Sequence, residues 1–560
     1  MNNVQKNKTA NYIVTFIIFY VVFLIFVFRF APTIQRGGLV GLVDEISNNF
    51  NMSNLLIFEL NFRYWIIGSL IYLFIISLII LSNRNIRHAD GYGSAKWGFV
   101  KDLNRKFRDK NNDLNIILSD KLRMGIDGYK TQRNCNVMVV GGSGAGKTRG
   151  YVKPNLMQLN TSYIVLDPKG EILRSTGTML KQNNYEIRVL NLYDMKKSNG
   201  YNPFRYLRNP QDVLTLANNY ISNTTPKDSK SSDPFWEKAE IMLLYALMFL
   251  LYEGGKPEEQ NFGMLVKLLG EIAVIENQRA GEQQLEAIDE LFKWHGERYK
   301  DSLATRYFKD FRDKAPGRTA RTILLTVAVR MAPFYLPEVQ SLMKQDEMDF
   351  DQLGKRKQAI FCVIPDSDTT FNFIVSMLYT QGFQELYHFA DRVICDRLPV
   401  PVNFLMDEFA NVKIPENFPE LLSTMRSRNV FCSIILQNIS QLKEIFGDKE
   451  WESIVGNCDE LVYLGGNEQS THEYVSTLLG KETINVSTDS VTKSRQGSMS
   501  INYQQVGREL LTPSEVRELP RDYSIIFVSG EKPIIDKKYN LEKHKRFKQL
   551  ADGGAKAYII

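Results

Sequence analysis

Residues Gly141 to Thr148 read GGSGAGKT and come directly after the apolar run Val137 to Val140. This fits the pattern G-x-x-x-x-G-K-[ST], in which a buried strand leads into a glycine loop whose backbone N–H groups surround nucleotide phosphates. Glycine suits such a loop because a side chain would hold the backbone away from the anion. We therefore predict that ATP binds at Gly141, Gly142, Ser143, Gly144, Ala145, Gly146, Lys147 and Thr148.

Two side chains of this loop are expected to carry chemistry. Lys147 should reach the terminal phosphates, which places it among the catalytic residues, and Thr148 should offer its hydroxyl to Mg²⁺. The alternative is a glycine turn with an incidental lysine. The strand in front of the loop favours the phosphate-binding interpretation.

The required carboxylates lie in residues 401–410, which read PVNFLMDEFA. This is an apolar strand that ends in Asp407 and Glu408. We predict that Asp407 holds Mg²⁺, directly or through water, and that Glu408 is the general base that polarises the attacking water. The alternative is that both are solvated surface acids, and the glycine loop upstream disfavours that interpretation.

The composition is that of a globular chain with room for two to four domains. Of its 560 residues 44% are hydrophobic, and 69 basic against 63 acidic residues give a net charge of +6. This small net charge is compatible with nucleic-acid binding but does not predict it. The cysteines form neither a metal pattern nor an even disulfide set, which indicates a reducing cytosol for most of the chain. They are Cys135, Cys362, Cys395, Cys432 and Cys458.

Two apolar runs near the N-terminus predict a membrane anchor made of residues 1–87. Tyr12 to Phe28 and Tyr64 to Leu81 contain no charged side chain and approach the length that crosses a hydrocarbon core of about 30 Å. We expect two transmembrane helices, at about 12–30 and 64–82. A cleaved signal peptide is the alternative for the first run, but no Ala-x-Ala site follows it.

Basic residues flank both runs and predict their orientation. Lys6 and Lys8 precede the first run, and Arg84 and Arg87 follow the second. Positive flanks stay in the cytoplasm, so both ends are expected there. The sequence thus predicts a multi-pass protein of the cell membrane, with the bulk of its chain in the cytoplasm.

Eight apolar, β-branched runs after the anchor predict the strands of an α/β domain. Most are separated by helix-like segments, which indicates a parallel sheet covered on both faces. Ligands bind such sheets at the carboxyl ends of the strands, where the glycine loop, Asp167, Asp407 and Gln437 all fall. The runs are 136–140, 162–167, 186–190, 358–365, 402–407, 431–436, 459–465 and 523–529.

Between about Arg205 and Lys355 the apolar spacing becomes helical. We predict a RecA-like P-loop nucleotide-binding domain in two parts, 88–204 and 356–540, with an all-α domain, 205–355, inserted between them. Residues 541–560 form a basic C-terminal tail. Its segment Lys543 to Lys548 is either a solvated end, which we favour, or a contact for nucleic acid or anionic lipid.

Three further side chains are candidates for roles in hydrolysis. Arg426 and Arg428 lie before the strand that ends at Leu436, and an arginine presented to a neighbouring subunit's nucleotide stabilises charge in the transition state. A surface ion pair is the alternative for both, and the sequence does not choose between them. Gln437, at the tip of that strand, is expected to sense the terminal phosphate.

Seven stretches in chain order resemble the coupling proteins of type IV secretion systems, the TraG-like ATPases of bacterial conjugation. They are YGSAKWG (92–98), GGSGAGKT (141–148), DPKGE (167–171), NPF (202–204), DPFW (233–236), DEFAN (407–411) and LLTP (510–513). The resemblance implies a membrane-anchored homo-hexameric motor that uses ATP and Mg²⁺ to deliver cargo. Its implied partners are single-stranded, relaxase-bound DNA, the relaxase and its relaxosome, and components of the secretion channel.

Two other functions remain open on the sequence. One is an FtsK-like translocase of double-stranded DNA. The other is a substrate-docking adaptor that binds ATP but turns little of it over. The choice of cargo, DNA or protein or both, is also open.

Overall fold

The structure is a computed structural model that describes residues 2–48, 61–83, 91–225, 234–273, 278–393, 396–415, 417–492 and 498–560. It contains two compact units. The first comprises Met1–Tyr92 with Asn485–Gln505, and the second comprises Gly93–Ile484 with Val506–Ile560.

The first unit contains the helices α1 (Asn2–Asn48) and α2 (Phe62–Asn83), which pack as an antiparallel pair. The hydroxyl of Tyr72 on α2 donates to the backbone carbonyl of Phe16 on α1 at 2.7 Å. Farther along the pair, a Cβ on Gly68 would come within 3.1 Å of the Val27 side chain. The bare glycine therefore lets the two helices approach closely.

The structure supports one membrane span rather than the two that were predicted. The apolar segment Phe16–Gly38 of α1 is long enough to cross a membrane, whereas the described apolar part of α2, Phe62–Leu78, is shorter than a span requires. The helix α1 itself continues to Asn48, with a kink at Gly38 (φ 61°), so the predicted end of the first span near residue 30 stays a prediction. A multi-pass arrangement is therefore unsupported.

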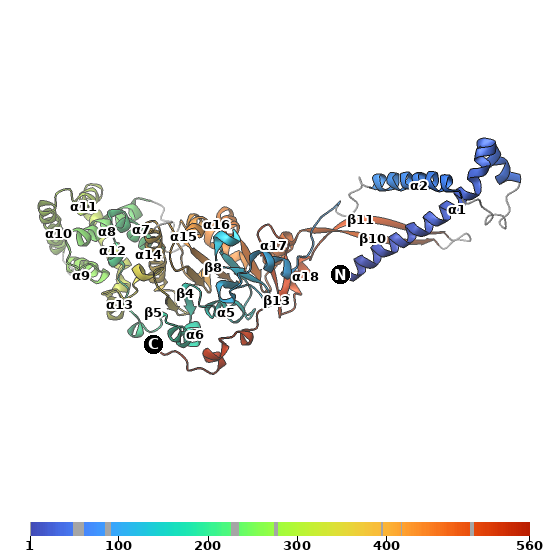
Figure 1. Ribbon diagram of the computed structural model, residues 1–560. Coiled ribbons are helices and arrows are strands. Elements are labelled where there is room, and N and C mark those ends of the chain that lie inside the picture. The colour runs from blue at the N-terminus through green and yellow to red at the C-terminus, as the bar shows by residue number, and fades with distance from the viewer. Residues whose placement is uncertain are drawn as a thin grey trace. The chain divides into compact units, whose positions relative to one another are not determined.

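The second unit is built on one mixed sheet, which is composed of nine strands in the described residues (Figure 1). Its order is β13-β12-β9-β3-β8-β7-β4-β6-β5. The seven strands from β9 to β5 are parallel, and β12 and β13 continue the sheet antiparallel at one edge. The strands are β3 (Val137–Val140), β4 (Ser162–Pro168), β5 (Glu186–Asn191), β6 (Gln358–Ile364), β7 (Val402–Met406), β8 (Val430–Leu436), β9 (Glu460–Tyr463), β12 (Tyr523–Val528) and β13 (Ile534–Lys537).

All eight predicted strands are present, but the expectation of a purely parallel sheet is wrong. The short strand β13 was not predicted, and its exposure alternates between buried and exposed residues. β12 and β13 form an antiparallel pair, so they need no crossover helix between them. An apolar run such as that of β12 does not itself encode the direction of its neighbours.

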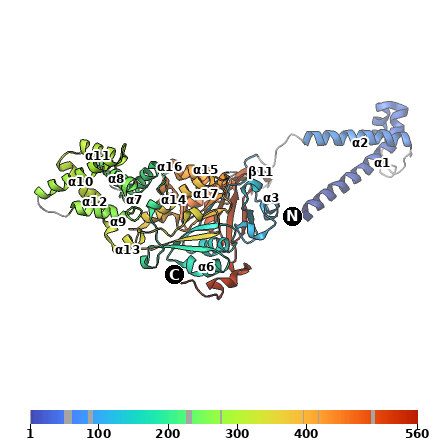
Figure 2. The same ribbon diagram turned by 60° about the vertical axis from the view of Figure 1, so that its left-hand side comes forward.

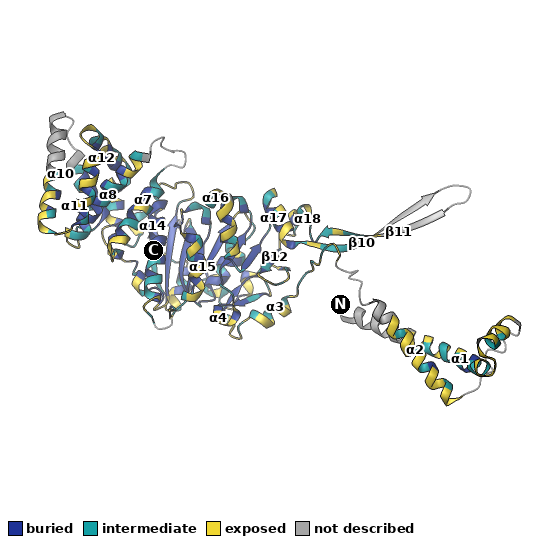
Figure 3. Ribbon diagram, turned by 90° about the horizontal axis from the view of Figure 1, so that it is seen from above, coloured by how far each residue is buried: buried dark blue, intermediate teal, exposed yellow. Residues whose placement is uncertain are grey.

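The strands of the sheet are largely buried (Figure 3), and their successive side chains point to opposite faces, so each strand contributes to a core on either side. On β3, Met138 and Val140 join one hydrophobic core, and Val137 and Val139 join the other. The first core continues without a break into the helices between β5 and β6. The strand tips are therefore held rigidly from both sides.

The helices that cover the first core include a run between β5 and β6, in the region predicted as all-α. That run is α7 (Pro210–Thr224), α8 (Pro234–Gly254), α9 (Phe262–Ala273), α10 (Gln278–Arg298), α11 (Leu303–Lys314), α12 (Arg318–Arg330) and α13 (Pro337–Leu342). The later helices are α14 (Asn372–Ala390), α15 (Phe418–Arg428), α16 (Ile439–Gly456), α17 (Gln469–Leu479) and α18 (Pro513–Arg517). The helical run and the sheet share one hydrophobic core, and this core does not separate an inserted domain from the rest of the unit. The predicted domain boundaries therefore stay a prediction.

The other face of the sheet carries shorter elements and the end of the chain (Figure 2). Two ion pairs there join the C-terminal segment to the body of the unit: Lys543 lies 2.8 Å from Asp120, and Lys545 lies 2.7 Å from Asp113. The predicted basic tail is thus packed, with these charges neutralised. The elements are α3 (Val100–Phe107), α4 (Gly128–Thr131), α5 (Lys153–Leu156), α6 (Glu171–Gln182), β1 (Asn115–Ile117) and β2 (Arg123–Gly125), while β10 (Lys481–Thr492) and β11 (Ser498–Glu509) form a separate two-stranded sheet.

Candidate functional site

The glycine loop starts where β3 ends and is fastened to the two neighbouring strands. The backbone N–H of Gly141 donates to the carbonyl of Leu436, the last residue of β8, at 3.0 Å, and that of Gly142 donates to the carbonyl of Gly465, just after β9, at 2.9 Å. Gly144 and Gly146 adopt φ values of 72° and 88°, which glycine reaches without strain. The sequence thus folds here into the conformation that a phosphate-surrounding loop requires.

Lys147 folds back over this loop. Its ammonium donates to the carbonyl oxygens of Gly141 at 2.8 Å and Gly142 at 3.3 Å. Burial lowers the pKa of Lys147 below its usual value, and the carboxylates of Asp407 and Glu408 oppose that effect. The cation therefore lies between the loop and the acidic pair, where charge on a nucleotide would be stabilised.

Thr148 and Asp407 meet at the strand tips, although they lie 259 residues apart in the chain. The Thr148 hydroxyl donates to Oδ2 of Asp407 at 2.8 Å. Burial raises the pKa of Asp407, while the hydrogen bond from Thr148 and the charge of Lys147 act to lower it. The other carboxylate oxygen, Oδ1, is buried and has no hydrogen-bond partner among the described residues.

This pair fits a magnesium ion. Mg²⁺ takes oxygen ligands and is held by one or two carboxylates together with substrate phosphates, rather than by a cage of protein groups. The orphaned Oδ1 of Asp407 is such an oxygen, next to the Thr148 hydroxyl.

Glu408 follows Asp407 and has an unusual backbone conformation, with φ at 56°. Non-glycine residues rarely adopt this left-handed conformation, and it persists only where surrounding contacts hold it. One such contact is to its carboxylate, whose Oε2 accepts a hydrogen bond from the side-chain amide of Asn411 at 2.9 Å. Glu408 is partly exposed at the same strand edge as the glycine loop.

Asp167, at the end of β4, has a structural role that follows from its contacts. Its two carboxylate oxygens accept the backbone N–H groups of Ile172 at 3.0 Å and Leu173 at 2.7 Å, in the first turn of α6. Burial raises the pKa of Asp167 to about 7, and these hydrogen bonds act against the rise. The side chain thus caps a helix beside the site.

Gln437 lies at the carboxyl ends of the parallel strands, whereas the two candidate arginines lie at the amino ends. Gln437 follows β8, which pairs with β3 on one side and with β7 on the other, as its predicted position required. Arg426 and Arg428 end α15, just before β8 begins, and so lie at the amino ends of the strands. Within one chain the structure does not bring them to the glycine loop.

The two arginines differ in their surroundings. Arg428 pairs with Asp391 at 2.9 Å and lies over the ring of Tyr387, 4.3 Å from its centre. Arg426 is exposed and forms no ion pair with the described residues. Of the two, only Arg426 is therefore available to a neighbouring molecule without breaking an ion pair within the described residues.

Sequence reasoning missed two features of the loop's surroundings. The ammonium of Lys538, next after β13, donates to the carbonyl of Ala145 at 2.9 Å, and burial lowers the pKa of this lysine. On the other side, a Cβ on Gly142 would lie 3.2 Å from the Cα of Gly466. Neither contact has a local sequence signal, because each joins the loop to a distant strand.

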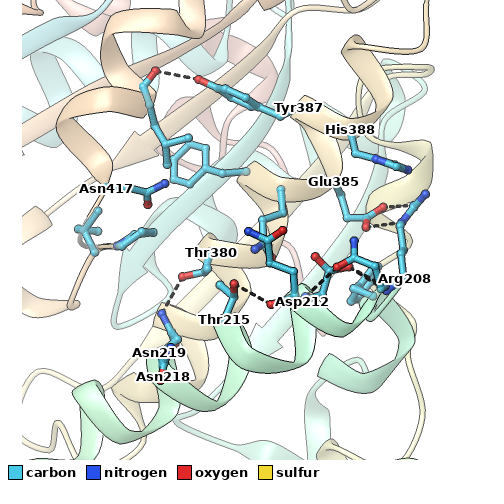
Figure 4. Close-up of a pocket in the computed structure, with 18 of the residues that line it drawn as sticks. Arg208, Asp212, Thr215, Asn218, Asn219, Thr380, Glu385, Tyr387, His388 and Asn417 are labelled. Carbon is cyan, nitrogen blue, oxygen red and sulfur yellow. Dashed lines mark hydrogen bonds and ion pairs between the residues drawn. The ribbon is translucent and has the colours of Figure 1, made fainter. Parts of the chain in front are cut away.

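A polar pocket of about 630 Å³ lies elsewhere, between α7 and α14 (Figure 4). Two of its charged groups pair with each other, since the Arg208 guanidinium binds the buried Glu385 carboxylate through Nε at 2.8 Å. Asn219 similarly donates to Thr380 at 2.7 Å across the two helices. We interpret it as a polar helix–helix interface.

The sheet order and the helices on both of its faces define an α/β fold with a central mixed sheet. Residues 96–552 match the family described as type IV secretory system conjugative DNA transfer. The chain belongs to this family, the coupling proteins of type IV secretion, as its resemblance predicted.

Individual relatives agree with that assignment. The VirD4 protein of Rhizobium radiobacter is 21% identical in an alignment of 492 residues that covers 85% of this chain and 67% of that protein. The conjugal transfer protein TraG of Escherichia coli is 23% identical in an alignment of 489 residues that covers 80% of this chain and 74% of that one.

Solved structures of the plasmid coupling protein TrwB have the same fold. TrwB in complex with the ATP analogue ADPNP superimposes with a TM-score of 0.59 at 16% identity, over 81% of this chain and 96% of that one. TrwB in complex with ADP and Mg²⁺ gives a TM-score of 0.57 at 17% identity, over 80% of this chain and 94% of that one.

Proposed function

We propose that this coupling protein is a membrane-anchored ATPase that delivers relaxase-bound DNA, or protein substrates, to a type IV secretion channel. One observation carries the enzymatic part: the 2.8 Å hydrogen bond that joins the glycine loop, through Thr148, to the acidic strand tip at Asp407. ATP hydrolysis needs both elements in one place.

The residues present account for binding of ATP and Mg²⁺. The backbone of Gly141 to Thr148 surrounds the phosphates, and Thr148 and Asp407 hold the metal. When bound between these two side chains, Mg²⁺ would neutralise the charge that develops on the phosphates during hydrolysis. The complexes of TrwB with ADPNP and with ADP and Mg²⁺ support this assignment.

The protein's own contribution to hydrolysis is positioning and proton acceptance. Lys147 exchanges its hydrogen bonds to the loop carbonyls for bonds to the terminal phosphates, which stabilises their charge. Glu408 accepts a proton from the attacking water. Gln437, which directly follows β8, senses the terminal phosphate.

Assembly of several subunits supplies the remaining catalytic group, an arginine. In a homo-hexamer, the end of one subunit's sheet at which the parallel strands begin meets the nucleotide-binding end of the next subunit's sheet. An arginine of one subunit therefore acts on the nucleotide of its neighbour. Arg426 suits this role because it is exposed, whereas Arg428 is held by Asp391. The relatives' names, which refer to conjugal transfer, support DNA and the secretion machinery as partners.

The N-terminal helix pair is the proposed membrane anchor. The segment Phe16–Gly38 supplies a helix of sufficient length and apolar character. Consistent with a lipid environment, its side chains Phe16, Ile18 and Phe19 are exposed. We expect the full chain to fractionate with the cell membrane.

A direct test measures ATP hydrolysis by the full chain in detergent, alone and with single- or double-stranded DNA. We expect hydrolysis that single-stranded DNA stimulates and that Lys147→Ala abolishes by weakening nucleotide binding. Stimulation by double strands alone would favour the FtsK-like alternative. Unimpaired conjugative transfer by the Lys147→Ala variant would instead favour the adaptor.

A further inference from the structure

The side chain of Glu408 is held by one specific neighbour. Asn411 lies at the end of the short 3-10 turn Phe409–Asn411, and its amide donates to Oε2 of Glu408 at 2.9 Å. The backbone N–H of Asn411 also donates to the backbone carbonyl of Glu408, again at 2.9 Å. These two bonds fix both the left-handed backbone and the carboxylate of Glu408.

Asn411 is in turn held from another element. Asn372, the first residue of α14, donates its side-chain amide to the backbone carbonyl of Asn411 at 2.7 Å. Asn372 is only 7% exposed, and its amide oxygen has no hydrogen-bond partner among the described residues. A buried amide kept at this cost in desolvation indicates that its one bond, to Asn411, matters.

The two asparagines lie where the helical run meets the strand tips. Both line a groove of about 880 Å³, which is also lined by Thr224 at the end of α7 and by Thr326 and Val329 of α12. The chain of bonds from Glu408 through Asn411 therefore ends at α14, on the side of the sheet that carries the inserted helices.

We propose that Asn411 is the positioning residue of Glu408, and that Asn372 holds Asn411 in place for it. This inference rests on the proposed role of Glu408 as general base. Asn411 occupies Oε2 and leaves Oε1 of the carboxylate to accept the proton of water. It also removes rotamer freedom that a partly exposed glutamate otherwise keeps.

The physical consequence concerns the catalytic rate rather than nucleotide affinity. A general base must lie within hydrogen-bonding reach of the proton that it takes, and a misplacement of about 1 Å costs on the order of 100-fold in rate. Neither asparagine belongs to the phosphate-binding loop. Loss of the positioning bond should therefore lower kcat and leave the KM for ATP nearly unchanged.

The test is a double-mutant cycle measured in single turnover with the full chain in detergent. Asn411→Ala is expected to lower kcat about 10- to 100-fold, and Asn372→Ala to lower it less. In a Glu408→Gln background, Asn411→Ala should cause no further loss, because the group that it positions is already disabled. Lys413→Ala, two residues along the same segment, is the matched control and should keep the wild-type rate.

Each outcome separates the inference from its premise. If Glu408→Gln is slow while Asn411→Ala keeps the wild-type kcat, the positioning role alone is wrong. An equal loss from Asn411→Ala in both backgrounds would indicate a general structural effect and would also overturn it. Full turnover by Glu408→Gln would remove the proposed base, and the positioning role with it. Melting temperature and ATP affinity, recorded for each variant, exclude unfolding as the cause.

Discussion

The hydroxyl of Thr148 lies 2.8 Å from Oδ2 of Asp407, across two strand tips that are not adjacent in the sheet. β8 separates β3 from β7, so this bond crosses the end of the intervening strand. It leaves Oδ1 of Asp407 buried and unpartnered by the described residues. The phosphate loop and the acidic pair thus form one site.

The first prediction concerns the metal. Thr148→Val removes the hydroxyl at nearly constant volume and should raise the Mg²⁺ concentration needed for half-maximal hydrolysis about 10- to 100-fold. Thr148→Ser, which keeps the hydroxyl, is the control and should behave nearly as the wild type. A Mg²⁺ titration of the ATPase rate decides the matter. An identical midpoint for the valine variant would remove Thr148 from the metal site.

The second prediction concerns Glu408. Glu408→Gln keeps the size of the side chain but removes the proton acceptor, so hydrolysis should slow about 100- to 10,000-fold. ATP affinity should persist, because the glycine loop is untouched. Equilibrium binding of a labelled ATP analogue and a single-turnover rate measure the two effects separately. A fall in affinity with an unaltered rate would show that Glu408 binds nucleotide and is not the base.

The third prediction separates the two arginines. Arg426→Ala should abolish stimulated hydrolysis, and a mixture of this variant with Glu408→Gln should regain part of it. Activity returns because a mixed ring contains interfaces that combine an intact Glu408 with a neighbour's intact Arg426. A mixture as inactive as its components would argue against action between subunits.

Arg428→Ala should instead act on stability. It removes the pair with Asp391 and the contact over Tyr387, which together contribute about 1 kcal/mol. A lower melting temperature with nearly wild-type turnover is the expected result. If this variant loses turnover at full stability, the roles of the two arginines are reversed.

The fourth prediction concerns Lys538, whose ammonium supports the phosphate loop at Ala145. Lys538→Met keeps the aliphatic chain but loses the charged donor, so ATP affinity should fall about 10-fold. The neighbouring Lys537, 3.6 Å from Asp522, provides the control Lys537→Met, which should bind ATP normally. Equal affinities in both variants would mean that the loop keeps its shape without this support.

The fifth prediction concerns pH and Asp167. Its pKa is about 7 in the folded protein, against an ordinary value of 3.8, so the folded state keeps a proton that the unfolded state has released. Its contribution to stability therefore falls as pH rises from about 4 to 7, by up to about 1.4 kcal/mol per pH unit. Asp167→Asn has no carboxyl group to titrate at this position, so its melting temperature should fall less over that pH range. Parallel curves for the two proteins, measured without nucleotide or Mg²⁺, would contradict the shift.

Local patterns predicted most of the strands and the main parts of the site. Val137 to Val140 and Val402 to Met406 are continuous apolar runs, which a sheet buried on both faces requires. The side chains that follow them lie at the same edge because parallel strands end together. For this reason the meeting of Thr148 with Asp407 was predictable before any contact was known.

Two predictions, the second membrane span and the parallel direction of the edge strands, were not supported. Apolar character alone does not show that a helix spans a membrane, and the described apolar part of α2, Phe62–Leu78, is shorter than a span requires. β12 has the same apolar character as its parallel neighbours, yet it pairs antiparallel with β9. Direction depends on the path of the connecting chain, which composition does not encode.

By itself the sequence determined the nucleotide loop, the acidic pair and the family, because each depends on residues close together in the chain. Only the tertiary structure decided that Lys538 supports the loop, that Asn372 holds Asn411, and that Arg428 is engaged while Arg426 is exposed. Those relations join segments up to 393 residues apart. They arise from how helices and strands pack, and side-chain periodicity along one segment carries no record of which distant segment will lie against it.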